Sequence, residues 1–431
     1  MKNTPYQKYF ALALLGVLLV GIAWWVLREQ FVFLMSGYGL SYGIYLWLIR
    51  RDVSDDVVFY FGILVRVSIV FALPLLSNDV YRFIWDGRLL VAGENPFALR
   101  PSEWLALAHP PNGIHSELHD LIYADNYTVY PPVHQAVFWL SARFSTSILG
   151  SVLILKSALV LADVGLLWLL RKLKRMGWWQ RLFVIYALNP LVVLEIAGNG
   201  HFEGLMVLFL VLGIVGLRKN DVRLAGLGWG LAIATKLLPL MLLPLVWRYF
   251  SKGKWASFLR FLGWILLVNV VLWLPMIRMG SLGHLMDSIW LYFESFEFNA
   301  SVYYVLKWLI PQGWRIGLIT NGLTILVIGY WAFRQKAKDW EQLMVNMAWV
   351  WLIYLLDSAI VHPWYVIPVL VLSEMAGKRY GLVWAGLIYL SYSHYWMGGM
   401  SEHFWLIGLE YALLGYFVVS TNRRILSKNL G

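Results

Sequence analysis

Apolar stretches long enough to cross a bilayer recur along almost the whole chain, and they constrain its fold more than any other feature. A spanning helix needs about 20 consecutive apolar residues. Stretches near that length lie at 8–27, 31–49, 57–76, 151–170, 261–279, 316–333, 381–396 and 404–420. Shorter ones lie near 182–197, 203–217, 224–235, 237–248, 343–357 and 362–374. The pattern predicts an all-α polytopic membrane protein with about 12–14 transmembrane helices, in one integral-membrane domain over residues 1–431.

The composition favours a membrane protein over the alternative, a large soluble α-helical protein. Only 14% of the residues are charged, against about 25% in soluble domains, so the chain has too little polar surface to cover itself in water. It contains no cysteine, which excludes a disulfide framework and thiolate chemistry. The first apolar stretch is followed by WWVLREQ rather than by a small-residue cleavage site, so we expect a retained anchor and not a cleaved signal peptide.

The basic residues predict the orientation of the chain. The formal net charge is +11. Most of the Lys and Arg residues form short clusters between the apolar stretches: RR at 50–51, RKLKR at 171–175, RKNDVR at 218–223, RYFSKGK at 248–254, RQKAK at 334–338, GKR at 377–379 and NRR at 422–424. With the amino terminus inside, these clusters all fall on one side, which the positive-inside rule makes cytoplasmic. The positive charge therefore indicates topology and attraction to anionic lipid, not a surface for nucleic acid.

The longest segment between the predicted spans is 77–150, which this topology places outside the cytoplasm. Within it, VHQAVFWLSARF at 133–144 is short and carries polar residues, so we interpret it as an interfacial amphipathic helix. Loops longer than about 12–15 residues are usually functional or disordered. Because this one is rich in aromatic residues and prolines, we predict an ordered extracytoplasmic loop with interfacial helices.

The histidines gather on the same predicted side. All nine fall in outer loops or at outer helix ends: His109, His115, His119, His134, His201, His284, His362, His394 and His403. The short cytoplasmic loops carry mainly basic residues. The chemistry of the protein is therefore expected on the extracytoplasmic face.

The stretch SNDVYRFIWDGRLLVAGENPF at 77–97 holds the strongest candidate for a catalytic group. Asp79, Arg82 and Asp86 are spaced i, i+3 and i+7, on one face of a helix, which Ser77 is suited to cap. In the structural alternative, Asp79 is a first-turn acid that pairs with Arg82. A charged cluster at a water–lipid boundary favours a functional role.

Three further stretches place polar or aromatic side chains at outer helix ends. NPLVVLEIAGNGHFEG at 189–204 carries acidic and amide groups among glycines, which let backbone approach a ligand; a flexible outer turn is the alternative. In ATKLLPLMLLPLVW at 234–247, Lys236 lies between two short helices, where it faces either a cavity or an anion or snorkels to the surface. HPWY at 362–365 offers rings for packing, for a sugar face or for a phosphate.

Other motifs carry less information. YPP at 130–132 is typical of a rigid entry into a helix. The chain has no Walker loop, no GxGxxG fingerprint and no HExxH motif. Within one predicted span, Lys156 and Asp163 lie about two turns apart, and we expect them to form a structural ion pair.

Six stretches, in order from about residue 77 to 370, together resemble the GT-C superfamily of integral-membrane glycosyltransferases. The closer resemblance is to bacterial polyprenyl-phosphate-mannose-dependent mannosyltransferases. The stretches are SNDVYRFIWDGRLLVAGENPF, YPPVHQAVFW, NPLVVLEIAGNGHFEGLMVLFLVL, LAIATKLLPLMLLPL, FNASVYYVL and HPWYVIPVL. The resemblance implies a catalytic aspartate in the first large outer loop, matched here by Asp79. Many relatives carry an adjacent acidic pair there; because Asn78 precedes Asp79, we expect no metal or other cofactor.

The resemblance also implies the substrates. The donor is a sugar on a polyprenyl monophosphate whose tail lies in the membrane lipid. A glycan or glycolipid is the expected acceptor, and a protein acceptor stays open. Mannose is favoured, with arabinose, glucose and galactose open. The residues expected to bind substrate are Arg82, Asp86, Arg88, Tyr130, Glu195, Asn199, His201, Glu203, Lys236, Asn299, His362 and Trp364.

The chemistry of transfer agrees with these residue types. Transfer needs a base for the acceptor hydroxyl and cations for the leaving phosphate. The expectation is an inverting hexosyltransferase in the inner (cytoplasmic) membrane, with its site on the extracytoplasmic face.

Two other classes remain open from the sequence. A transporter or lipid flippase would place broken or charged helices near the bilayer midplane and would show internal repeats. A non-catalytic membrane scaffold or a polymerase-associated subunit would need none of the site chemistry. A lateral groove that ends at Asp79 favours the transferase, whereas a central cavity open to both sides favours transport.

Overall fold

The computed structural model is built almost entirely of helices. It describes residues 5–122, 125–250, 254–278, 283–284, 296–311, 314–336 and 339–428. Within these ranges the only β pairing is an isolated bridge between Phe298 and Ile360. The long helices are α1 (Pro5–Trp25), α2 (Phe31–Leu48), α3 (Asp55–Val70), α8 (Ile148–Arg175), α14 (Trp255–Arg278), α17 (Ile316–Arg334), α18 (Trp340–Asp357) and α21 (Phe404–Lys428). The predicted all-α class is confirmed.

Five helices, α1, α2, α8, α14 and α17, are each long and apolar enough to cross a membrane. A sixth span is formed if α10 (Pro190–Val192) with η1 (Val193–Gly198) is joined to α11 (Glu203–Arg218) across a 115° bend. The shorter apolar helices are α12 (Val222–Thr235), η2 (Leu238–Leu242) with α13 (Leu243–Phe250), η3 (Pro363–Tyr365) with α19 (Val366–Met375), and the first part of α21. The protein is therefore a multi-pass membrane protein; the total of 12–14 spans stays a prediction.

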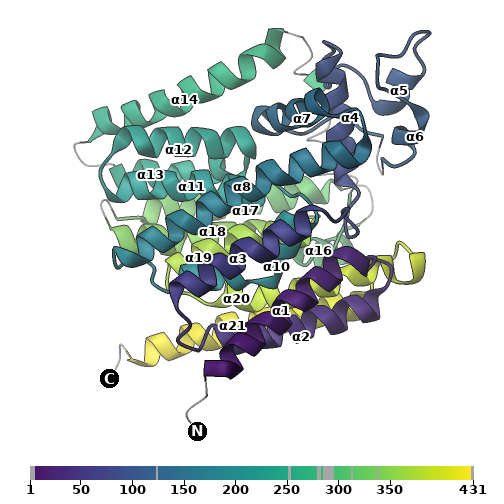
Figure 1. The fold of residues 1–431 in the computed structure, drawn as a ribbon. Helices are drawn as coiled ribbons and strands as arrows, with labels where there is room; N and C mark the ends of the chain where they lie inside the picture. Colours follow the sequence, from purple (N-terminus) through teal and green to yellow (C-terminus); the bar gives the residue numbers. More distant parts are fainter. Residues whose placement is uncertain are drawn as a thin grey trace.

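Most of these helices run side by side in one oblique direction, with four short helices gathered at one end, away from both termini (Figure 1). The four are α4 (Asp79–Val91), α5 (Pro101–Leu105), α6 (Ser116–His119) and α7 (Pro132–Phe144). They occupy the chain between α3 and α8, where the sequence predicts a loop with interfacial helices. The extracytoplasmic placement of 77–150 and the single-domain organisation stay predictions.

The packing of α4 against α7 is unusually close. At Gly87 in α4, a Cβ atom would lie 2.2 Å from the backbone oxygen of Phe138, so the crossing needs a residue without a side chain. One turn earlier, Phe83 stacks on the Phe138 ring with centroids 4.6 Å apart. These contacts hold α4 rigidly, and they therefore also fix the position of Asp79, the first residue of the helix.

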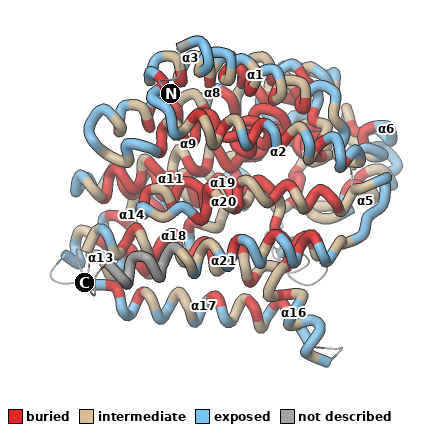
Figure 2. Tube along the Cα trace, turned by 90° about the horizontal axis from the view of Figure 1, so that it is seen from below, coloured by how far each residue is buried: buried red, intermediate tan, exposed pale blue. Residues whose placement is uncertain are grey.

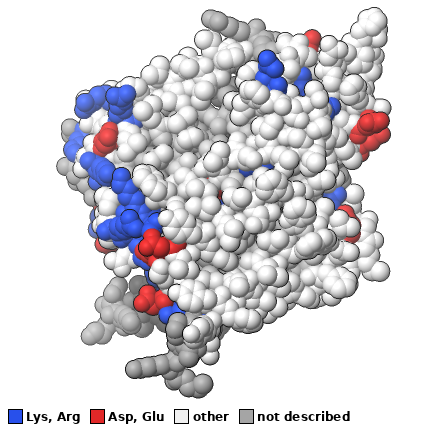
Figure 3. All heavy atoms as spheres, viewed as in Figure 1, with Lys and Arg blue, Asp and Glu red and all other residues white. Residues whose placement is uncertain are grey.

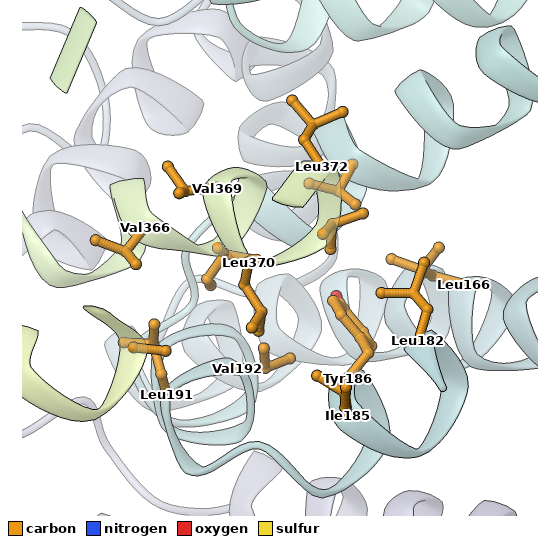
Figure 4. Close-up of a cluster of buried hydrophobic side chains, with 14 of the residues drawn as sticks. Leu166, Leu182, Ile185, Tyr186, Leu191, Val192, Val366, Val369, Leu370 and Leu372 are labelled. Atoms are coloured by element: carbon orange, nitrogen blue, oxygen red, sulfur yellow. The ribbon is translucent and has the colours of Figure 1, made fainter. Parts of the chain in front are cut away.

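The main core lies around α8, α9 (Leu182–Leu188), α11 and α19. Figure 2 shows buried residues concentrated in these central helices and mostly exposed or half-buried residues along α17. Figure 4 shows part of this core, where side chains such as Tyr186, Val192 and Leu370 meet. On α17, Ile325, Leu326 and Phe333 are exposed, as expected of a surface that faces lipid rather than water.

Two charged residues inside α8 are paired differently from the sequence expectation. Asp163 accepts a hydrogen bond from Nε of Arg66 on α3 at 2.5 Å, with both side chains fully buried, and another from the Tyr186 hydroxyl at 2.6 Å. Lys156 donates to two backbone carbonyls at the C-terminal end of α3. The predicted Lys156–Asp163 pair is wrong, because each side chain reaches across to α3 rather than along its own helix.

The chain between α19 and α21 completes the fold near the site. The apolar stretch predicted at 381–396 divides into α20 (Tyr380–Leu387) and the 3₁₀ segment η4 (Ile388–Gly398). The short helix α16 (Val302–Leu309) follows the bridge at Phe298. These segments bring aromatic and charged residues of the C-terminal half toward α4.

Candidate active site

Two cavities meet at the first residue of α4. Cavity A, of about 170 Å³, is lined among others by Arg28, Asn126, Thr128, Phe298, His394 and Tyr395. Cavity B, of about 250 Å³, is lined among others by His134, His201, Glu203, Lys236, Leu237 and Leu238. The walls of both contain Asp79, Val129, Tyr130, His362 and Trp364. A carboxylate at the junction of two cavities is placed to act on a group held in either one.

Asp79 owes its position to the start of α4. Its backbone N–H donates to the Ser77 hydroxyl at 3.3 Å, and its place in the first turn sets the carboxylate at the positive end of the helix dipole. The side chain is 40% exposed, and Oδ2 lies 3.6 Å from Nε2 of His201, too long for a hydrogen bond but close for opposite charges. Burial opposes ionisation, but His201 and the Lys236 ammonium outweigh it and lower the pKa of Asp79. The carboxylate is therefore ionised and available as a base.

The fully buried carboxylate of Glu195 holds the His201 ring in position. Glu195 lies in the π-helical segment η1, a widened turn of the kind frequent at functional sites. Its Oε2 lies 3.1 Å from Nδ1 of His201 and accepts from Nδ2 of Asn199 at 2.9 Å. Its Oε1 accepts from the hydroxyls of Tyr389 and Tyr392 at 2.8 and 3.0 Å. The arrangement fixes the imidazole so that Nε2 faces Asp79.

The two site histidines differ in charge. Burial lowers the pKa of His201, but its contacts with Asp79 and Glu195 raise it overall to about 9. Burial lowers the pKa of His362 to about 3. His201 is thus an imidazolium at neutral pH and His362 is neutral, so His362 offers a hydrogen bond rather than a positive charge.

Stacked rings connect these histidines. The His201 ring lies 3.6 Å from the Trp364 ring, and Trp364 lies 4.4 Å from His362, both nearly parallel. Nε2 of His201 is buried and, among the described residues, has no hydrogen-bond partner. It is therefore free to donate to a ligand that enters at the junction.

Lys236 supplies a second cation on the wall of cavity B. It follows the last residue of α12, at the break before η2, and its ammonium pairs with Glu203 in the first turn of α11. The ammonium also lies 4.2 Å from the centroid of the Tyr365 ring. With Leu237 and Leu238 beside it, cavity B combines a cationic wall with an apolar one.

Arg82 does not pair with Asp79. Its Nε donates to the fully buried Asp86 at 2.8 Å, and its Nη1 donates to the backbone oxygen of Asn126 at 2.6 Å. Asp86 also accepts from the Thr128 hydroxyl. The structural alternative, in which Asp79 pairs with Arg82, is wrong, because the guanidinium instead compensates the buried charge of Asp86. The pair anchors the segment before α7, which forms a wall of both cavities.

Comparison with known proteins places the chain in a family. A family model described as the N-terminal domain of alpha-(1->6)-mannopyranosyltransferase matches residues 2–251. The chain belongs to this family. The match confirms the resemblance to bacterial mannosyltransferases, and the matched range includes Asp79, His201 and Lys236 but not His362.

Two relatives show how far the likeness extends. Alpha-(1->6)-mannopyranosyltransferase B of Corynebacterium glutamicum is 30% identical over 231 residues, which cover 52% of this chain but only 36% of the relative. Alpha-(1->6)-mannopyranosyltransferase A of Mycobacterium tuberculosis is 24% identical over 447 residues, covering 91% of this chain and 82% of the relative. No solved structure shows a significant match to the chain.

In this mannopyranosyltransferase-family protein, the predicted site residues divide into two groups. The residues on cavity walls are Asp79, Arg82, Tyr130, His201, Glu203, Lys236, His362 and Trp364. The residues behind the walls are Asp86, Arg88, Glu195, Asn199 and Asn299. The second group holds other groups in place and does not face either cavity.

The contacts of three residues behind the walls explain their positions. Arg88 donates to the backbone oxygens of residues 113 and 146, each at 2.8 Å, and so ties two loop segments to α4. Asn299 is fully buried and donates to Glu410 on α21. Asn199 accepts from the backbone N–H of residue 76 and donates to Glu195. These contacts favour support of the site over direct contact with substrate.

The structure also adds wall residues that the sequence motifs did not indicate. Arg28 lies in the turn between α1 and α2, and Tyr392 and Tyr395 lie in η4. The available signal was weak: Arg28 follows a predicted span at its outer end, and neighbouring His394 was one of the outer histidines. None of them belongs to a stretch that carries the family resemblance.

Proposed function

We propose that the protein is an inverting glycosyltransferase. It transfers a hexose, with mannose favoured, from a polyprenyl-phosphate donor to a glycan or glycolipid acceptor. The observation that carries this proposal is the position of ionised Asp79 where a cation-lined cavity meets a second, polar and aromatic cavity. The names of the two mannopyranosyltransferase relatives support mannose as the transferred sugar.

Cavity B suits the donor. A lipid-linked sugar phosphate brings an anion and an apolar chain to the same place, and a buried anion needs charge-assisted hydrogen bonds. Lys236 and His201 provide cationic donors, while Leu237 and Leu238 provide apolar wall. The membrane lipid would take the rest of the polyprenyl tail.

The transfer then needs few groups. Asp79 accepts the proton of an acceptor hydroxyl that enters from cavity A, while the oxygen attacks the anomeric carbon. The bond from that carbon to the phosphate oxygen breaks, and the electron pair leaves with the phosphate, which Lys236 and His201 stabilise. The proton passes from Asp79 to water after release. One displacement inverts the anomeric centre, so a β-linked donor gives an α-linked product.

Glu195 acts on this reaction through His201. Its carboxylate has no cavity-facing position, but it lies against Nδ1 of the imidazole and keeps that ring charged and oriented. The same logic lets outer carboxylates orient histidine ligands in metal sites. Glu195 is therefore a positioning residue, in place of the substrate-binding role expected from the sequence.

We propose that the reaction is metal-independent. Lys236 and His201 compensate the negative charge of the phosphate, as a divalent cation would otherwise do. Asn78 precedes Asp79 at the position where an acidic pair would hold a metal. In the part of the chain that the structure describes, no three His, Asp or Glu side chains come together as a metal-binding group.

The distribution of charge supports a site on the extracytoplasmic face of the cytoplasmic membrane. On the face shown in Figure 3, most Lys and Arg residues gather at the end of the molecule opposite to α4–α7. The positive-inside rule makes that end cytoplasmic. Both cavities adjoin α4, which favours a one-sided site over a transport pathway between the two faces.

The test is a transfer assay with purified protein. It receives a panel of polyprenyl-phosphate sugars with alkyl mannosides as acceptors, and nucleotide sugars serve as the contrasting donors. The proposal expects mannose transfer from the lipid donor, an α-linked product, and no loss of rate with a chelator. Transfer from nucleotide sugars alone, or from none of the lipid donors, would overturn it.

A further inference from the structure

Cavity A is built from segments that lie far apart in the chain. Arg28 comes from the turn between α1 and α2, Phe298 from the segment before α16, and Tyr395 from η4. The backbone N–H of Met397 donates to the oxygen of Glu29 at 3.2 Å, which joins the end of η4 to the Arg28 turn. The contact fixes one rim of the cavity without using the Arg28 side chain.

The Arg28 guanidinium is held in place with donors to spare. Its carbon lies 4.4 Å from the centroid of the Tyr395 ring, and Nε donates to Glu29 at 3.1 Å. The side chain is 13% exposed. Among the described residues, neither Nη atom makes a hydrogen bond. Because the planar guanidinium is already stacked on a ring, it loses little conformational entropy when it binds a pair of oxygens.

Rings form the adjoining wall. The Phe298 ring lies 4.7 Å from His362, 5.1 Å from His394 and 6.0 Å from Tyr395. Backbone pairing holds Phe298 in place, since its N–H donates to the oxygen of residue 359 at 3.0 Å. The wall is therefore a preformed aromatic surface beside a free guanidinium fork.

The chemistry of cavity A differs from that of cavity B. A hexose presents a C–H face that packs on aromatic rings and pairs of hydroxyls that accept from a planar fork. Asn126 contributes further polar lining. Cavity B instead offers the Lys236 ammonium and leucines, which suit a lipid phosphate. The carboxylate of Asp79 lies within reach of both.

We propose that cavity A is the subsite for the terminal hexose of the acceptor glycan, and that Arg28 is its specificity-determining residue. This inference rests on the proposed glycosyl transfer. The Nη groups of Arg28 donate to two neighbouring hydroxyls of that hexose, its ring packs against Phe298 and Tyr395, and the attacking hydroxyl points to Asp79.

The experiment compares Arg28→Gln and Arg28→Lys in the full-length protein, with a polyprenyl-phosphate mannose donor and an octyl α-mannobioside acceptor. Losing a charged hydrogen bond is expected to raise the acceptor KM at least about tenfold in Arg28→Gln. The donor KM should stay within about twofold. Arg28→Lys keeps the charge but not the fork, so its acceptor KM should fall between those of wild type and Arg28→Gln.

Arg260→Gln is the matched control. Arg260 is an exposed arginine on α14, and among the described residues its side chain hydrogen-bonds only within its own helix turn. Both Michaelis constants of Arg260→Gln should equal those of wild type. An unchanged acceptor KM in folded Arg28→Gln protein, or a raised donor KM instead, would overturn the inference.

A binding measurement separates this inference from the proposed reaction. Tryptophan fluorescence, with Trp364 on the cavity wall, is titrated with the octyl mannobioside in the absence of donor. Saturable binding that weakens in Arg28→Gln supports the subsite even if no transfer is observed. Equal binding by wild type and Arg28→Gln contradicts the subsite even if transfer succeeds.

Discussion

Replacing Glu195 by glutamine tests whether the charge of His201 drives the reaction. The amide keeps the shape of the carboxylate and still accepts from the hydroxyls of Tyr389 and Tyr392. It removes the negative charge that lies 3.1 Å from Nδ1 of His201. The imidazolium then loses the nearer of its two carboxylate partners while it remains buried, so we expect its pKa to fall.

The size of the effect follows from the pKa of His201. At about 9, the imidazole is almost fully protonated at pH 7.5. A return to its ordinary value near 6.5 leaves about a tenth protonated at that pH. If the leaving phosphate needs the cation, turnover of Glu195→Gln at pH 7.5 should fall about tenfold, while the loss at pH 6 should be less than twofold.

The assay is the pH profile of kcat between pH 5.5 and 9.5. Wild type should hold its rate until the pH approaches 9, and Glu195→Gln should lose rate from about pH 6.5 upward. Glu374→Gln, at a half-buried glutamate of α19 that lines neither cavity, serves as the control and should follow wild type. Identical profiles for wild type and Glu195→Gln would refute the role of the imidazolium.

Three further outcomes are expected. Lys236→Met keeps the apolar stem but removes a phosphate-binding charge, so the donor KM measured in the transfer assay should rise about tenfold or more, and an unaltered value would move the phosphate elsewhere. Asp163→Asn leaves Arg66 buried without its counter-charge, so chemical denaturation should show a loss of about 3–5 kcal/mol of stability, and a loss below 1 kcal/mol would contradict the buried pair. In this cysteine-free chain, Asn112→Cys should react with an impermeant thiol reagent on intact cells and Lys336→Cys only after permeabilisation, with the reverse pattern placing the site in the cytoplasm.

The features that the sequence predicted well depend on local patterns. Runs of apolar residues indicated the all-α membrane architecture, and the residues that follow or interrupt those runs included Asp79, His201 and Lys236. The structure brings these three together at one junction. Hydropathy and charge are properties of single segments. They identify polar residues at the ends of spans even when the contacts between segments are not known.

Partner choice could not be predicted in the same way. Spacing allowed Arg82 to meet either Asp79 or Asp86, and burial of the second carboxylate decided between them. Likewise, Asp163 pairs with Arg66 because α8 packs on α3. Which of several nearby charges pair depends on which are desolvated, and that is a property of tertiary packing.

The part of the cavity A wall that contains Arg28 shows a second limit of prediction from the sequence. Arg28 and Tyr395 stand near opposite ends of the chain and meet only because η4 packs beside the turn after α1. Neither lies in a motif. In the sequence, a single arginine after a predicted span looks the same as an arginine that only sets the orientation of the chain in the membrane. A subsite assembled from such residues is visible only when the chain is folded.

The most direct test of the account is the turnover of Asp79→Asn, measured beside its melting temperature. The amide preserves the shape of the side chain at the start of α4 but cannot accept the acceptor proton. Loss of a positioned base lowers kcat about 10²–10⁴-fold, and with the side chain 40% exposed the melting temperature should change little. A folded Asp79→Asn protein that transfers sugar at near the wild-type rate would contradict the assignment of Asp79 as the catalytic base.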